Sequence, residues 1–141
     1  MAMKKWIYIC CLPLLLLFNG CKKEPVAQQK SGVSLPVVSN LVLEKSGEKT
    51  AKISWSLPTN IPAEINQPLS VYIEVGEILG PTKMVTVFNT TMADAPTSFS
   101  YDVPNPVKKY LITVKVRSTT KTPDVNYSSN IFSLGQTVTY N

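Results

Sequence analysis

Side chains that could carry catalytic or metal chemistry are present in this chain, but their types and spacing do not combine into a site. The 141 residues include no histidine, which removes the commonest protein metal ligand and the commonest general base. The 9 acidic residues are scattered, and Glu74 and Glu77, both on an expected strand, project to opposite sides of it. The sequence contains no glycine-rich phosphate loop and no acid-rich calcium loop. We therefore expect no catalytic residue, no metal ion and no cofactor, and an enzyme is the weakest of the possible function classes.

All three cysteines lie near the N-terminus, where the composition differs sharply from the rest of the chain. A short basic start precedes an almost unbroken apolar run over residues 6–18, which contains Cys10 and Cys11. A basic start, an apolar run of this length and a small residue at its end are typical of a secretory signal peptide, whereas a membrane-spanning helix needs about 20 apolar residues. We expect residues 1–20 to be a signal peptide; an uncleaved anchor is the alternative.

The end of this segment carries a more specific pattern. Phe18, Asn19, Gly20 and Cys21 resemble a bacterial lipobox. The resemblance implies cleavage after Gly20 and attachment of lipid to Cys21, so that acyl chains hold the protein to a membrane. The polar residues that follow predict a flexible linker, so residues 21–35 are expected to be a lipidated cysteine and a tether. The outer membrane is the expected location, with its periplasmic or cell-surface side left open; a plain signal peptide before a chance cysteine is the alternative.

From residue 36 onward the pattern is that of an all-β domain. Val, Ile and Thr dominate, and these residues favour pleated, half-buried surfaces. Apolar and polar residues alternate with a period of two in four runs, which cover residues 51–57, 69–76, 98–103 and 110–117. Turns rich in Pro, Gly and Asn separate these runs, and each run has one face for a core and one for solvent. We expect residues 36–141 to form an antiparallel β-sandwich of about seven strands.

Several residues of this domain occur in an order that resembles a fibronectin type III domain, an immunoglobulin-like sandwich. They are the stretch 38–41, then Ile53 to Pro58 around Trp55, and finally Val103 and Pro104 followed by Tyr110. The resemblance implies a buried structural role for Trp55 and a tyrosine corner at Tyr110, whose hydroxyl bonds to the upstream backbone. It also implies strands over residues 69–77, 83–89, 97–103 and 110–118, and a final strand after Tyr127. The whole chain resembles single-domain lipoproteins of Gram-negative gut anaerobes.

Fibronectin type III domains typically act by contact, through loops at one end or through an exposed sheet face. We expect a candidate binding surface at Tyr72, Leu111 and Tyr127, on the solvent side of the strands that the resemblance implies. The alternative is that neighbouring side chains cover Tyr72 and Leu111. On the same face, Glu74 is expected to meet Lys115 and Arg117 as a weak cross-strand charge pairing.

The charge pattern narrows the choice of partner. The formal net charge is +5, but the basic residues do not cluster, so nucleic acid is not an expected partner. The sequence therefore predicts a lipoprotein, attached to a membrane through Cys21, whose non-catalytic sandwich recognises an unidentified protein or glycan. The alternative is an accessory or structural subunit of an outer-membrane complex.

Overall fold

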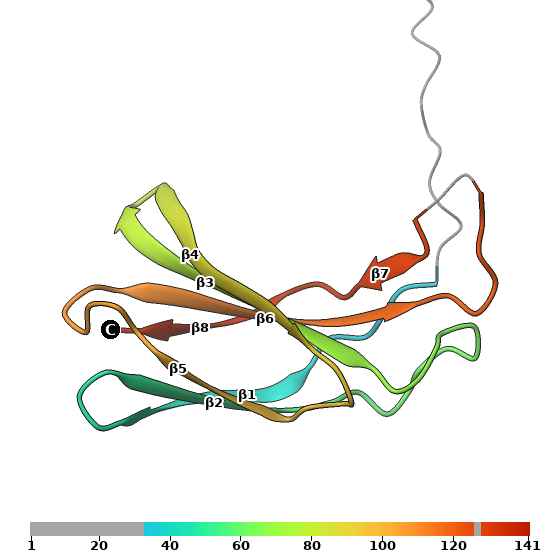
Figure 1. Ribbon diagram of the computed structural model, residues 1–141, viewed down its shortest axis with the longest axis horizontal. Helices are drawn as coiled ribbons and strands as arrows, with labels where there is room; N and C mark the ends of the chain where they lie inside the picture. The colour runs from blue at the N-terminus through green and yellow to red at the C-terminus, as the bar shows by residue number, and fades with distance from the viewer. Residues whose placement is uncertain (1–32, 126–127) are drawn as a thin grey trace, which may run out of the picture. The chain divides into compact units, whose positions relative to one another are not determined.

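Two antiparallel β-sheets make up the part of the chain that the structure describes. The computed structural model describes residues 33–125 and 128–141, and no helix in these ranges could span a bilayer. These ranges contain eight strands (Figure 1). They are β1 (Ser39–Ser46), β2 (Thr50–Ser56), β3 (Ser70–Gly80), β4 (Lys83–Met92), β5 (Ser98–Asp102), β6 (Tyr110–Thr119), β7 (Asn130–Phe132) and β8 (Gln136–Tyr140).

The order of the strands defines the sandwich. One sheet has the order β1-β2-β5, and the other has the order β4-β3-β6, with β7 and β8 both pairing with β6. Every pairing is antiparallel, and the two sheets lie one above the other in Figure 1. The predicted fold class is confirmed: the described domain is all-β and forms an immunoglobulin-like, fibronectin type III-like sandwich.

The period-two alternation of the sequence places the core between the sheets. Along β6, four side chains are 0% exposed, and the residues between them are only partly buried. Strands β2 and β3 contribute in the same way, and all these side chains belong to one hydrophobic cluster. Burying each Val or Ile side chain contributes roughly 1.5–3 kcal/mol, so these central strands supply most of the apolar stabilisation. The fully buried members of β6 are Tyr110, Ile112, Val114 and Val116.

The edge strand β4 is longer than the sequence predicts and is irregular. It continues to Met92, and the hairpin that it forms with β3 projects from the body of the sandwich in Figure 1. Val75 pairs with Phe88, but Gly76 pairs with Thr86, so that Val87 is an extra residue in β4. Such a bulge bends the strand and increases its twist, which explains why the hairpin turns away from the sheet.

The last strand of the sandwich is divided into β7 and β8. Phe132 lies opposite Arg117, whereas Gln136 lies opposite Val114, so the chain has one residue more than β6 between these pairs. At the break, the Val116 N–H donates to Ser133 Oγ at 2.9 Å, and the Ser133 N–H donates to the Val116 carbonyl at 2.9 Å. The hydroxyl of the buried Ser133 thus replaces a backbone acceptor. This division accounts for eight strands where about seven are expected.

Candidate functional site

The solvent-facing side of the β4-β3-β6-β7 sheet, here called the outer face, carries two of the three residues predicted to form a binding surface. Tyr72 lies opposite Lys115, and Leu111 lies opposite Gly76. Tyr72 and Leu111 are partly buried and share this face, but four positions along β3 separate Tyr72 from Gly76. At a rise of about 3.3 Å per residue that spacing is roughly 13 Å, so the two side chains do not form one contact patch. Tyr127 lies outside the described residues, as do Gly20 and Cys21.

An aromatic residue that the sequence analysis did not single out lies beside Tyr72. The rings of Tyr72 and Phe132 meet edge to face with 5.9 Å between centroids, and the Arg117 guanidinium lies 5.7 Å from the centre of the Phe132 ring. Phe132 is 49% exposed. We call Tyr72, Phe132 and Arg117 the aromatic–arginine cluster. Because β7 has only 3 residues, no run of alternating residues marks Phe132 in the sequence.

The hydrogen bonds of Glu74 differ from the expected charge pairing. Its carboxylate accepts from the Tyr72 hydroxyl at 3.3 Å and from Thr86 Oγ1 at 2.9 Å. The prediction that it pairs with Lys115 and Arg117 is wrong, because the register puts Thr113 opposite Glu74. Burial, and then the charge of Glu74, raise the pKa of Tyr72. Glu74 therefore anchors the Tyr72 hydroxyl and leaves Arg117 without a carboxylate.

Beyond Phe132, the outer face continues into a polar pocket at one pole of the sandwich. Its cavity volume is about 260 Å³. Arg117 lines it and is held by neutral acceptors: Nη2 donates to Asn130 Oδ1 at 3.0 Å, and Nη1 donates to Thr91 Oγ1 at 3.4 Å. The full lining is Asn66, Pro68, Ser70, Arg117, Ser118, Thr119 and Asn130.

The loop between β2 and β3 and the end of β6 close this pocket from the side of the pole. The Asn66 N–H donates to the Thr119 carbonyl at 2.9 Å, and Asn66 Nδ2 donates to Thr119 Oγ1 at 2.8 Å. Ser118 Oγ donates to the Asn66 carbonyl at 2.6 Å, next to the cis peptide bond between Gln67 and Pro68. These contacts join the segment after β2 to the end of β6. The wall of the pocket is therefore fixed by hydrogen bonds between backbone and side chains.

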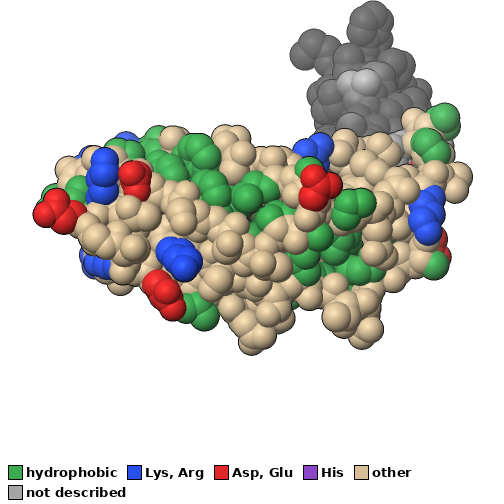
Figure 2. Space-filling model, turned by 60° about the horizontal axis from the view of Figure 1, so that its bottom comes forward, with side chains coloured by type: hydrophobic (Ala, Val, Ile, Leu, Met, Phe, Trp, Pro, Cys, Tyr) green, Lys and Arg blue, Asp and Glu red, His purple; other side chains and the backbone are tan. Residues whose placement is uncertain are grey.

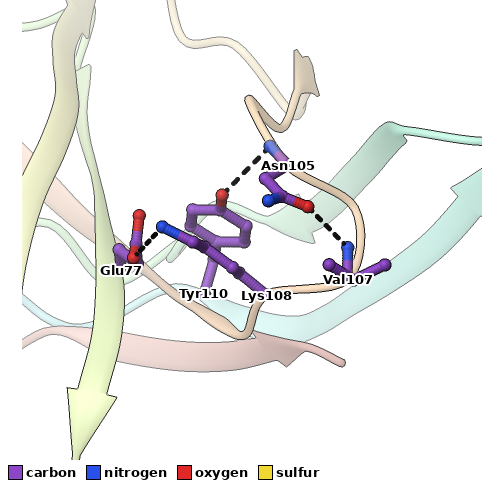
Figure 3. Close-up of polar contacts among 5 residues, drawn as sticks. All are labelled: Glu77, Asn105, Val107, Lys108 and Tyr110. Carbon is purple, nitrogen blue, oxygen red and sulfur yellow. Dashed lines mark hydrogen bonds and ion pairs between the residues drawn. The ribbon is translucent and has the colours of Figure 1, made fainter.

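Tyr110 and Trp55, the two residues predicted to be structural, lie in the core. The Tyr110 hydroxyl accepts from the Asn105 N–H at 3.2 Å, and the Asn105 side chain in turn accepts from the Val107 N–H at 3.1 Å (Figure 3). Trp55 is 4% exposed, and its indole Nε1 donates to the Pro96 carbonyl at 2.9 Å. Neither aromatic side chain is available to a ligand.

The same corner holds an ion pair at the surface. Lys108 Nζ lies 2.6 Å from Glu77 Oε1, and the hydrogen bond to Glu77 raises the pKa of Lys108 (Figure 3). Lys108 lies in the loop between β5 and β6, and Glu77 lies near the end of β3, so the pair joins the corner to the sheet that contains β3. The ion pair therefore helps to position the loop.

Groups that could support catalysis do not converge in the described part of the chain. Those residues contain no cluster of three or more potential metal ligands. Two serines precede a lysine by three positions, at Ser46–Lys49 and Ser118–Lys121, the spacing of a serine–lysine dyad. Ser46 and Lys49 are exposed at the ends of the β1–β2 turn, and Ser118 donates to a backbone carbonyl. Within 33–125 and 128–141, neither pair is joined by a hydrogen bond.

Surface charges are scattered over the face shown in Figure 2 and do not form one charged patch. In Figure 2, Lys and Arg side chains are scattered over the visible face and lie near Asp and Glu, while hydrophobic side chains gather in separate groups between uncharged polar ones. The described residues form two ion pairs: Lys49–Asp102, which is exposed, and Lys108–Glu77, in which the Glu77 side chain is 14% exposed. This face therefore offers mixed polar and apolar contacts rather than a continuous charged surface.

Several solved structures resemble the domain. One is a computer-based redesign of a β-sandwich protein, with a TM-score of 0.49, 19% identity, and coverage of 75% of this chain and 88% of the other. A second is the third fibronectin III domain of the human KIAA0343 protein, with a TM-score of 0.47, 16% identity, and coverage of 77% and 85%. A third is the fibronectin type III domain of the human fibronectin type III domain containing protein 3, with a TM-score of 0.43, 19% identity, and coverage of 78% and 90%.

Comparison by sequence gives a family. No curated protein matches the chain. A family model matches residues 21–140, which is most of the chain and includes every strand described above. The chain therefore belongs to the family described as domain of unknown function DUF4945.

Proposed function

We propose that this protein is a membrane-anchored lipoprotein whose non-catalytic sandwich recognises a protein or glycan at the cell envelope, through the outer face and its polar pocket. The aromatic–arginine cluster is the observation that carries the proposal. Aromatic residues and Arg are the residue types that contribute most to binding energy in interfaces. Phe132 keeps 49% of its surface exposed while Arg117 lies over its ring.

Membrane attachment is supported by the sequence. The four residues ending at Cys21 resemble a lipobox, and the family match begins at residue 21, where the mature chain would start. Two or three acyl chains on that cysteine would give durable attachment, whereas one chain binds only marginally. The tether predicted over residues 21–35 would let the sandwich reach ligands away from the bilayer.

A second candidate function is that of an accessory subunit in an outer-membrane complex, and the projecting β3–β4 hairpin favours it. The hairpin carries Leu79 (49% exposed), Met84 (45%) and Val85 (46%), apolar residues that a partner protein could cover. This apolar hairpin and the aromatic–arginine cluster are different parts of the surface. Variants can therefore separate the two functions.

The test of attachment is metabolic labelling with palmitate in cells that express the full chain. Label is expected in the wild type and absent in Cys21→Ala, with Cys11→Ala as the matched control that retains it. Continued labelling of Cys21→Ala would exclude the lipobox.

The test of recognition is capture of envelope proteins and glycans by the purified full chain. Phe132→Ser is expected to lose the captured ligand, while Val107→Ser, a matched change at an 88% exposed residue outside the outer face, retains it. A stoichiometric protein that is lost with Met84→Ser and kept with Phe132→Ser would support the accessory-subunit function instead.

A further inference from the structure

The polar pocket beside Arg117 contains hydrogen-bonding groups that the fold does not use. Among the described residues, the Ser70 hydroxyl, Asn66 Oδ1 and Asn130 Nδ2 have no hydrogen-bond partner. The pocket therefore presents both donors and acceptors. Sugar hydroxyl groups can both donate and accept, so such a mixed set suits a sugar better than it suits an apolar ligand.

Arg117 adds a positive charge that the described residues leave without a carboxylate. The ion pairs found among the described residues involve Lys49 and Lys108 and not Arg117. The carboxylate of Glu74 already accepts hydrogen bonds from Tyr72 and Thr86. A guanidinium has five N–H donors, and two of these donate, to Asn130 and Thr91. The remaining N–H donors of the guanidinium lie in its plane, an arrangement that can bind a carboxylate through two parallel hydrogen bonds.

The freedom of the Arg117 side chain is restricted before any ligand binds. Its side chain is held by two hydrogen bonds and lies over the Phe132 ring, so little side-chain freedom remains to be lost on binding. The Phe132 and Tyr72 rings extend the site along the outer face, where the C–H groups of an adjoining sugar could pack. The cavity of about 260 Å³ is slightly smaller than the usual ligand pocket of about 300–1,000 Å³, which suits one sugar ring rather than a folded peptide.

We propose that this pocket binds a carboxylated sugar, a unit of uronic-acid type in an acidic glycan. Arg117 holds the carboxylate, and Ser70, Asn66 and Asn130 bind the ring hydroxyls. An acidic side chain of a peptide could also engage Arg117, but it has no hydroxyl groups of its own for these three residues. The proposal rests on the recognition function proposed above and names the ligand class for it.

The experiment titrates the full chain, purified in detergent, with glucuronate and with glucose, which differ only in the carboxylate. Backbone and side-chain NMR shifts are followed at Arg117, Ser70 and Asn130. Glucuronate is expected to shift all three residues in a saturable way, and glucose to bind roughly tenfold or more weakly because it lacks the charged partner of Arg117. Acetate and a glutamate-containing tripeptide complete the set of probes.

Variants separate a binding role from a structural one. Arg117→Gln is expected to weaken glucuronate binding by roughly tenfold or more, and Arg117→Lys, which keeps the charge and loses the planar fork, to weaken it less. Lys115→Gln is the matched control, since it removes one positive charge from the same face of β6 outside the pocket, and its binding should stay within about twofold. Ser70→Ala provides a second variant that leaves the charge in place. Thermal unfolding of each variant checks that the sandwich is intact.

Each alternative result overturns the proposal in a different way. Acetate binding as tightly as glucuronate would mean a general anion site, and tighter binding of the glutamate tripeptide would mean a peptide site. If no probe binds but the full chain still captures an envelope ligand through Phe132, the sugar assignment fails and the recognition function stands. If Phe132→Ser also captures as the wild type does, the recognition function fails as well.

Discussion

Replacing Tyr110 by Phe removes a single hydroxyl from the core and leaves the ring in place. In the wild type that hydroxyl accepts the Asn105 N–H at 3.2 Å, and the Tyr110 side chain is 0% exposed. The substitution leaves the Asn105 N–H without its acceptor. A fully buried orphan donor costs about 1–3 kcal/mol, but Asn105 is only half-buried, so water can reach it in part. We expect a loss of about 1–2 kcal/mol in the free energy of unfolding.

The measurement is reversible denaturant unfolding, with thermal unfolding alongside it. For a domain of this size, the expected loss lowers Tm by about 5–10 °C. Tyr101→Phe is the matched control, because the Tyr101 hydroxyl has no hydrogen bond among the described residues and its side chain is partly buried. Its effect should stay below about 0.5 kcal/mol. Equal losses in the two variants, or no loss in Tyr110→Phe, would show that the hydrogen bond to Asn105 does not stabilise the corner.

Three further predictions concern the core and the titration of the domain. Trp55→Ala should cost about 3–5 kcal/mol in denaturant unfolding, because it empties a buried site and orphans a backbone carbonyl; a loss below about 1 kcal/mol would contradict that role. Gly135→Ala should cost about 1–3 kcal/mol, because the added Cβ would lie 2.6 Å from Cγ2 of Thr113 on the central strand; an unchanged Tm would mean that the strand moves freely. Burial raises the pKa of Tyr72 and of Tyr101 above the ordinary value of 10.0, so their contribution to stability is present below pH 10 and is lost as the pH rises through the folded-state pKa values. In absorbance titrations, Tyr72→Phe and Tyr101→Phe should each lack one late-titrating tyrosine of the wild type, and loss of an early-titrating tyrosine in both variants would refute this.

The strands of the core could be predicted from the sequence because burial there follows a strict period of two. The alternation around Trp55 and along residues 110–117 gives both the strand and the face that it buries. The tyrosine corner could be inferred although the slot six residues before Tyr110 holds Pro104, because the buried Val103 lies directly before it. The alternation and the corner motif are local sequence patterns, and the packing of the two sheets buries the same side chains that these patterns mark as apolar.

The irregular parts of the fold could not be predicted in the same way. The pairing of Glu74 depends on the register between β3 and β6, which is set by the whole sheet and not by neighbouring residues. The bulge at Val87 has no signature in its own residues, since Val, Thr and Phe suit a regular strand equally well.

The candidate site could be predicted only in part, because only some of its residues lie in a long alternating run. Tyr72 could be predicted from the sequence because it alternates with Val71 and Ile73, two buried residues of β3. Phe132 was not, since β7 has only 3 residues and no run long enough to show a period. The polar pocket depends on Asn66 and Asn130, which come from distant segments and meet only after folding.

The extra residue between β7 and β8 corrects the phase of the final strand. Before the break, odd-numbered Ile131 faces the core and Phe132 faces solvent; after it, even-numbered Val138 and Tyr140 face the core. Without that residue the strand would continue with its parity unchanged, placing Thr139 inside and Tyr140 outside. The interruption thus allows one strand to expose Phe132 to solvent at one end and to bury Tyr140 in the core at the other. Each half keeps its own alternation of buried and exposed residues, and the single-residue offset joins the two alternations in one strand.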